Sequence, residues 1–248
     1  MHPTAHSVPT PHRPPRRPAR ALVGATVAAA VAAVALVSAP AGPAAAREAS
    51  GKAVTHQTVA ARTAVHYSDG RPRNARLSIP AIGIHRLRVI AYRGKTDDGP
   101  GTKIQDRGIA ASPFGREGGT GPGGLGNYQV TAHRTAHGGV FRRTPSLHRG
   151  AKLLVDSGRW RYVYRVRTTR WVSFRSASSL RAQRAAVPGK PGAVPDRGYI
   201  TISTCATPED HAHGNYWTDR YGNPEHRIDK IGVLVKRVQN PFWHRKRR

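Results

Sequence analysis

The sequence has very little cysteine: Cys205 is the only one among its 248 residues. A disulfide needs two cysteines, so none forms within the chain. Cys205 ends the run GYITISTC, which is typical of a strand, and Pro208, acidic residues and histidines follow it. Side chains that carry out chemistry are often displayed where a strand gives way to a loop. This position leaves two interpretations open: a small buried residue that packs, or a reactive thiol.

Acidic and aromatic residues are also scarce. Asp and Glu number 13 against 41 Lys and Arg, which gives a net charge of +28 at pH 7. Such an excess favours an anionic partner, whether nucleic acid, an anionic membrane face or an acidic cell-wall polymer. The sequence shows no nucleic-acid-binding module, and its aromatic residues do not alternate with basic ones as in a base-stacking platform. No specific nucleic-acid partner is therefore expected.

A long uncharged apolar run lies near the N-terminus. Residues 21–37 read ALVGATVAAAVAAVALV, and small residues extend the run to position 46. Seventeen residues span about 26 Å as a helix, barely enough for the hydrocarbon core of a membrane. The arginines of residues 1–20 predict that this end stays in the cytoplasm. Residues 21–46 are either a retained membrane anchor or a signal segment cleaved after Ala44–Ala46.

Both interpretations of the N-terminus place the rest of the chain outside the cytoplasm. Cysteines outside the cytoplasm are usually paired, so an unpaired one indicates an intermolecular bridge or a reactive thiol. The expected organisation is a basic cytoplasmic N-terminus, the membrane or signal segment, a linker, a folded domain and a basic tail. These parts span residues 1–20, 21–46, 47–75, 76–239 and 240–248.

The folded domain has the pattern of an all-β protein. Short apolar alternations bounded by turn residues are typical of strands. They occur at 76–92, 127–134, 152–157, 160–174, 198–204 and 231–238. Residues 93–126 are rich in Gly and Pro and are expected to be mostly loop, and modest helices are expected near 139–150 and 176–186. Many short strands separated by turns predict a β-barrel or sandwich.

Two further residues occupy strand-end positions like that of Cys205. His133, in YQVTAHRTAHGGVF, ends an apolar run and is the best placed of the thirteen histidines. A neighbouring base or cation can lower the pKa of a thiol and make it a nucleophile. Arg227, in EHRIDKIGVLV, immediately precedes the last strand-like run. Its guanidinium is a candidate donor to the oxyanion of a tetrahedral intermediate.

These motifs resemble those of the sortases, cysteine transpeptidases that attach proteins to Gram-positive cell walls. TISTC is similar to the TLxTC signature of the family. TAHRTAHGGVF resembles its histidine motif, most of all the class E form GHRTTHG followed by Phe. LSIPAIGI resembles the first-strand pattern, and HRIDKIGVLV resembles the arginine followed by the final strand. The four motifs stand in the family's order and cover about residues 76–238.

The resemblance implies an eight-stranded β-barrel with short helices and long loops. It makes Cys205 the nucleophile, His133 the general acid/base, and Arg227 the stabiliser of the substrate and the oxyanion. The implied reaction cleaves an LPXTG-like sorting signal between Thr and Gly, and class E members of high-GC actinobacteria are associated with LAXTG. An amine on a peptidoglycan precursor of the lipid II type then resolves the thioacyl enzyme. The implied partners are secreted proteins that carry the signal, and the implied location is the outer face of the cell membrane.

The sequence departs from the family's pattern at two places. Ala132 stands where many members have Gly before the histidine. The Cys205–Arg227 gap of 22 residues is longer than in typical members. A long loop beside an active site is usually functional, and this one contains Arg220 as a rival for the arginine role. The spacing from Arg227 to GVLV fits the family better.

Several other residues are candidates for substrate binding. Thr204 stands next to the nucleophile, and His137 follows the candidate base. Tyr216, Trp217 and Tyr221 lie in the long loop. The sequence HAH at 211–213 suggests zinc binding together with Cys205, but a fourth ligand is missing. No metal or organic cofactor is expected.

Two other functions compete with transpeptidation by a sortase. L,D-transpeptidases also use Cys and His, but their Ser-His-Gly-Cys motif is absent around Cys205. The remaining alternative is a sortase-like barrel with weak or no turnover that binds wall components or partner proteins.

Overall fold

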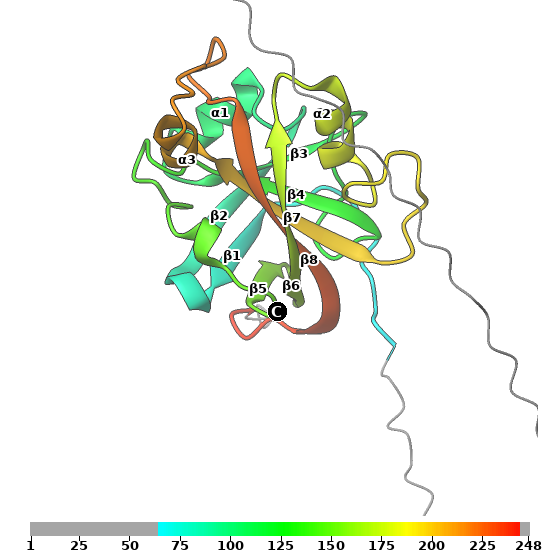
Figure 1. Cartoon of the computed structure of the whole chain (residues 1–248). Coiled ribbons are helices and arrows are strands. Elements are labelled where there is room, and N and C mark those ends of the chain that lie inside the picture. Colours follow the sequence, from blue (N-terminus) through cyan, green and yellow to red (C-terminus); the bar gives the residue numbers. More distant parts are fainter. Residues whose placement is uncertain (1–63, 244–248) are drawn as a thin grey trace, which may run out of the picture. The chain divides into compact units, whose positions relative to one another are not determined.

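The computed structural model describes residues 64–243, which form a closed barrel of eight strands (Figure 1). Around the barrel the strands follow the order β1-β2-β3-β4-β7-β8-β6-β5. Each strand has a neighbour on both sides, although β3 and β4 pair at a single position, Ala111 with Thr131. The predicted eight-stranded barrel is confirmed. The strands are β1 (Ala75–Ile79), β2 (Ile84–Arg93), β3 (Ala110–Phe114), β4 (Gly126–Thr131), β5 (Lys152–Ser157), β6 (Trp160–Ser173), β7 (Gly198–Cys205) and β8 (His226–Gln239).

Five short helices connect the strands and cover parts of the barrel. They are η1 (Pro80–Ile82), α1 (Gly99–Gln105), η2 (Thr144–Ser146), α2 (Ala177–Arg184) and α3 (Thr207–Ala212). In Figure 1, α1 and α3 lie near the same end of the barrel. Tyr221 lies so close to Gly99, in α1, that a Cβ on this glycine would be 3.0 Å from the Tyr221 hydroxyl. The segment between β7 and β8 therefore packs against α1.

Alternate side chains of strand β4 face the apolar core and helix α2. Tyr128 and Val130 belong to the buried apolar cluster inside the barrel. Their neighbours Asn127 and Gln129 are also buried, although they are polar. The Asn127 amide donates to the Gln183 carbonyl at 3.0 Å, and the Gln129 amide donates to the Arg184 carbonyl at 3.4 Å. Carbonyl groups at the end of α2 therefore accept from the buried side-chain amides of β4, although the Gln129 oxygen has no partner within residues 64–243.

Residues 93–126 are mostly loop, as expected, but the segment also holds α1 and β3, which the sequence did not predict. Asp98 caps the N-terminus of α1, where its carboxylate accepts from the Gly101 N–H at 2.8 Å, and Pro100 lies in the first turn. Strand β3 is short and contains Pro113, which ordinarily argues against a strand. Its parallel pairing with β2 stabilises the strand, although its own sequence does not favour one.

The last residues of the predicted linker pack on the barrel. Val65 and Tyr67 contact the apolar core, and the Ser68 N–H donates to the Gly123 carbonyl at 2.8 Å. The absence of side chains in the glycine-rich run at 118–126 lets the backbone of residues 68–71 approach it closely. An added Cβ at Gly121 would fall 1.9 Å from the Arg71 carbonyl oxygen, so only glycine fits there.

The predicted membrane segment, residues 21–46, lies outside the described residues. Within residues 64–243, no helix has the length and apolar character needed to cross a bilayer.

Candidate active site

The barrel topology brings the three strand-end residues to one place. Strands β4 and β7 run parallel as neighbours, with Thr131 paired to Ser203. His133 and Cys205 each lie two residues further along, at the same end of the two strands. Strand β8 lies antiparallel on the other side of β7, and Arg227 is the direct partner of Cys205. Residues up to 94 positions apart in the sequence (133 to 227) thus meet at one end of the barrel.

Two buried side chains tie the histidine segment to the nucleophile strand. Thr204 is 2% exposed, and its hydroxyl donates to the Ala132 carbonyl at 2.9 Å. Arg134 donates to the Cys205 carbonyl at 3.2 Å and forms a two-pronged ion pair with Glu209 in α3. The Thr204 hydroxyl therefore holds the backbone next to His133 against strand β7. Sequence analysis did not identify Arg134, although the residue directly follows His133 in the histidine motif.

Cys205 is a free, partly buried thiol. Burial raises its pKa, because the thiolate is poorly solvated there, and the positive charge of Arg227 acts in the opposite direction. The thiol form therefore dominates at neutral pH. A nucleophilic role for Cys205 would therefore require a base that takes the proton of the thiol.

Arg227 is almost fully buried, at 1% exposure, and its guanidinium is held from three sides. Its Nε donates to Asp97 Oδ2 at 2.9 Å, and Nη1 donates to the Pro224 carbonyl at 2.7 Å. The Phe174 ring lies 4.1 Å from Cζ. Nη2 has no partner within the described part of the chain. A buried donor without a partner is costly, and the residue that carries it is the direct cross-strand partner of Cys205.

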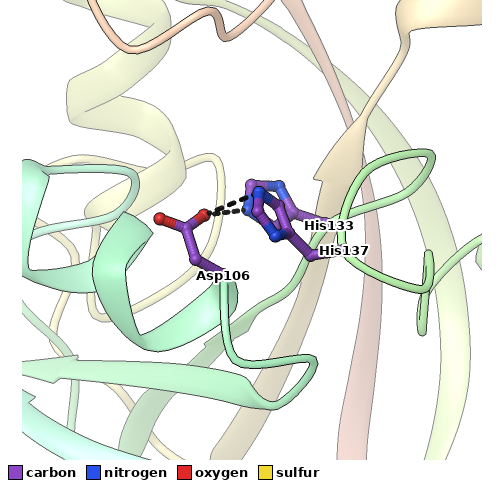
Figure 2. A group of neighbouring side chains, drawn as sticks. All are labelled: Asp106, His133 and His137. Atoms are coloured by element: carbon purple, nitrogen blue, oxygen red, sulfur yellow. Dashed lines mark hydrogen bonds and ion pairs between the residues drawn. The ribbon is translucent and has the colours of Figure 1, made fainter.

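His133 faces a carboxylate that sequence analysis did not identify. Its Nε2 lies 2.8 Å from Oδ1 of Asp106, which directly follows α1. The Nε2 of His137 lies 3.4 Å from the same oxygen, and the two imidazoles stack (Figure 2). When Nε2 of His133 donates to Asp106, Nδ1 is left as the proton acceptor.

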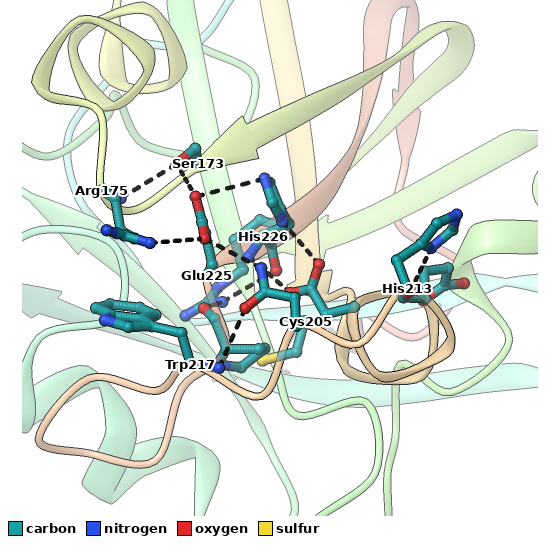
Figure 3. A network of polar contacts seen from close by, with 12 residues as sticks. Ser173, Arg175, Cys205, His213, Trp217, Glu225 and His226 are labelled. Atoms are coloured by element: carbon teal, nitrogen blue, oxygen red, sulfur yellow. Dashed lines mark hydrogen bonds and ion pairs between the residues drawn. The ribbon is translucent and has the colours of Figure 1, made fainter. Parts of the chain in front are cut away.

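The long segment between Cys205 and Arg227 is anchored rather than loose. Asp210 in α3 accepts from the His226 N–H at 3.0 Å and lies 2.7 Å from its Nδ1. Glu225 accepts from Asn215 at 3.0 Å and from Ser173 at 3.0 Å (Figure 3). These contacts fix His226 and Glu225, the two residues that precede Arg227.

The rival arginine is differently placed. Arg220 is exposed, and its guanidinium lies 4.8 Å from the ring of Tyr221 in the same segment. Arg227 is opposite Cys205 in the sheet. The geometry therefore supports Arg227 for the role of donor at the nucleophile.

The candidate substrate-binding aromatic residues lie in the same segment as Arg220. Tyr216 is 69% exposed and contacts the His211 ring at 4.7 Å. The Trp217 ring lies 5.9 Å from the Arg175 guanidinium. Within residues 64–243, neither aromatic side chain contacts Cys205, His133 or Arg227 through a hydrogen bond. Their part in substrate binding stays a prediction.

A buried carboxyl, Asp229, lies on β8 two residues after Arg227. It is 1% exposed, and Gln183 Nε2 donates to its two oxygens at 3.3 and 3.2 Å. Burial raises the pKa of Asp229 from 3.8 to about 6. The unfolded chain therefore binds this proton only near and below about pH 4, whereas the folded protein holds it up to about pH 6. Stability should fall as the pH rises through this interval.

The substitution Asp229→Asn should remove this pH dependence. It is expected to raise the free energy of unfolding at neutral pH by about 1–3 kcal/mol, because the amide carries no charge to desolvate. Urea unfolding between pH 4 and pH 7 measures the effect. The exposed Asp196 provides the control, since Asp196→Asn should leave the pH dependence in place. An equally steep loss of stability in Asp229→Asn would contradict the assignment.

A closed eight-stranded barrel with Cys, His and Arg at adjoining strand ends is the arrangement that the resemblance to the sortases implies. The family model described as the sortase domain matches residues 77–221, which is more than half of the chain. The chain belongs to the sortase family. The matched range includes His133 and Cys205 and ends before Arg227.

Solved structures of sortases share the fold. The sortase SrtA from Actinomyces oris aligns with a TM-score of 0.52 and 19% identity, over 73% of this chain and 94% of that one. Sortase E1 from Streptomyces coelicolor, solved with a tripeptide in its active site, aligns with a TM-score of 0.50 and 19% identity, over 73% and 98% of the two chains. A search of curated proteins found no match.

Proposed function

We propose that this sortase cleaves an LPXTG-like sorting signal between Thr and Gly, with Cys205 as nucleophile, His133 as acid/base and Arg227 as oxyanion donor. The observation that carries the proposal is the meeting of these residues at the ends of three adjoining strands. The unpartnered Nη2 of Arg227 supports it further, since it is a free donor on the residue paired with Cys205 across the sheet.

The first half of the reaction forms a thioester. Nδ1 of His133 takes the proton of the Cys205 thiol, and the thiolate attacks the carbonyl carbon of the substrate threonine. Arg227 donates to the carbonyl oxygen as negative charge develops on it. The C–N bond to glycine then breaks, and the His133 imidazolium gives its proton to the leaving amine.

The second half transfers the acyl group to an amine. His133, neutral again, accepts a proton from the incoming amine as its nitrogen attacks the thioester carbon. The C–S bond breaks, and the thiolate regains a proton from the imidazolium. The acceptor proposed is a peptidoglycan precursor amine of the lipid II type. Neither step needs a metal ion or an organic cofactor.

The proposed substrate and setting are those of class E sortases. The motif TAHRTAHGG favours LAXTG over LPXTG as the sorting signal. Residues 21–46 would hold the protein in the cell membrane, with the barrel outside among secreted proteins that carry the signal. In the alternative interpretation, the same segment is a signal peptide that is cleaved, and the barrel is secreted.

The experiment compares quenched fluorescent peptides that carry LAXTG or LPXTG. Each is incubated with the full-length protein, with and without hydroxylamine as a surrogate amine. We expect cleavage after Thr, faster for LAXTG, with hydroxylamine captured on the product. Faster cleavage of LPXTG would refute the specificity. Cleavage of neither peptide by folded protein would favour a barrel that binds without turnover.

A further inference from the structure

A cluster of three metal-ligating side chains lies next to the active site. Asp106, His133 and His137 each offer one ligand atom, and these atoms all lie within 4.8 Å of one another. Asp106 Oδ1 is 2.8 Å from Nε2 of His133 and 3.4 Å from Nε2 of His137. Figure 2 shows the carboxylate facing both rings. We call this group the Asp-His-His cluster.

Two of the three separations in this cluster fit a tetrahedral zinc ion, and the third is bounded at 4.8 Å. Zinc binds imidazole nitrogen and carboxylate oxygen at about 2.0–2.2 Å, so neighbouring ligands in a tetrahedron are about 3.3 Å apart. The distances of 2.8 and 3.4 Å from Asp106 Oδ1 to the two imidazoles lie on either side of that value. Three protein ligands leave the fourth position for water. Calcium and magnesium require more oxygen ligands than this cluster supplies.

The backbone at His137 gives a second, independent indication. Its φ is +47°, in the left-handed region that non-glycine residues rarely occupy. Such strain persists where the surrounding structure enforces it, and it gathers at functional sites. Here the result is a histidine turned back so that its ring stacks on His133 at a centroid distance of 5.1 Å. The conformation holds both imidazoles on the same carboxylate.

The cluster is also open to an ion from solution. The side chain of His137 is 48% exposed and that of Asp106 is 39% exposed. Cys205 is not a member of the group. His211 and His213, the two histidines of the HAH sequence, are not members of the group. The Nδ1 of His213 instead lies 2.7 Å from the Glu209 carbonyl oxygen.

We propose that the Asp-His-His cluster binds a zinc ion, which occupies Nε2 of His133 and reversibly inhibits the enzyme. A metal on this nitrogen removes the hydrogen bond to Asp106 and fixes the ring that has to move protons. The inhibition rests on the proposed function, because it acts through His133 as acid/base. The binding itself does not depend on that role.

Binding is measured by calorimetry with zinc chloride on the full-length Cys205→Ala protein, which removes thiol ligation. We expect one zinc ion per chain. Adding His137→Ala or Asp106→Asn should weaken binding by about tenfold or more, since each removes one of three ligands. Adding His211→Ala is the control and should leave binding unchanged. Tetrahedral coordination is checked by the visible spectrum with cobalt in place of zinc.

Inhibition is measured on the protein that retains Cys205, relative to each variant's own metal-free rate. Zinc should inhibit, a chelator should restore the rate, and His137→Ala should need about tenfold more zinc for the same fractional loss. Loss of zinc binding in Cys205→Ala, or equal binding after His137→Ala and Asp106→Asn, would overturn the site. Absence of peptide cleavage would count against the proposed function alone, because calorimetry reports the site without turnover.

Discussion

Replacing Cys205 with alanine is expected to abolish cleavage of the sorting-signal peptide. The thiol is the only one in the chain, so no second nucleophile of its kind can form the thioester. Loss of a catalytic nucleophile lowers turnover by at least about 10,000-fold. The measurement is the rate of peptide cleavage with and without hydroxylamine. Folding should be retained, because alanine fills most of the space of a cysteine at the end of a strand.

The control for this prediction is the neighbouring Ser203→Ala. Ser203 is buried on the same strand and accepts from Gln183 at 3.3 Å, so its loss perturbs packing near the site without touching the thiol. Turnover should persist there. Cleavage that continues in Cys205→Ala at a rate near that of the wild type would remove Cys205 from the nucleophile role.

Removing the guanidinium of Arg227 is expected to have the second largest effect. Loss of an oxyanion donor costs about 100- to 1,000-fold in turnover, so kcat should fall by that factor in Arg227→Lys. Lysine keeps the positive charge opposite Asp97 and therefore protects the fold, whereas Arg227→Ala leaves that carboxylate buried and unpaired. The exposed Arg220→Ala should change kcat by less than about tenfold. Kinetics with the LAXTG peptide measure all three.

A second readout of Arg227 does not depend on turnover. Its positive charge lowers the pKa of the Cys205 thiol against the effect of burial. Arg227→Ala should raise that pKa further, so alkylation of the thiol by iodoacetamide should shift to higher pH. Arg220→Ala should leave the alkylation profile unchanged. The opposite ranking in both assays would transfer the role to Arg220.

The alternation of apolar and polar residues made most strands of the barrel predictable from the sequence. The runs at 152–157 and 198–204 alternate clearly and coincide with β5 and β7 within one residue. The strand-end positions of Cys205, His133 and Arg227 followed from the same pattern. That they meet depends on β4, β7 and β8 being neighbours, which alternation alone does not determine.

The residues that sequence analysis did not identify share a physical reason. Asp97 and Asp106 lie in the Gly- and Pro-rich segment at 93–126, which has no apolar period to indicate its structure. Their roles come from tertiary contacts with Arg227 and His133. Helix α3 has only six residues, and such short helices depend on packing more than on propensity. The direction of the Thr204 hydroxyl likewise depends on which neighbour β7 has on that side.

The most direct test is the mass of the intact protein after brief incubation with an LAXTG peptide and no amine acceptor. The central claim predicts that wild-type protein gains the mass of the peptide up to its threonine. The added mass should map to Cys205, disappear with hydroxylamine, and be absent from Cys205→Ala. Peptide cleaved at the Thr–Gly bond without any adduct on Cys205, at a rate unaffected by Cys205→Ala, would contradict it.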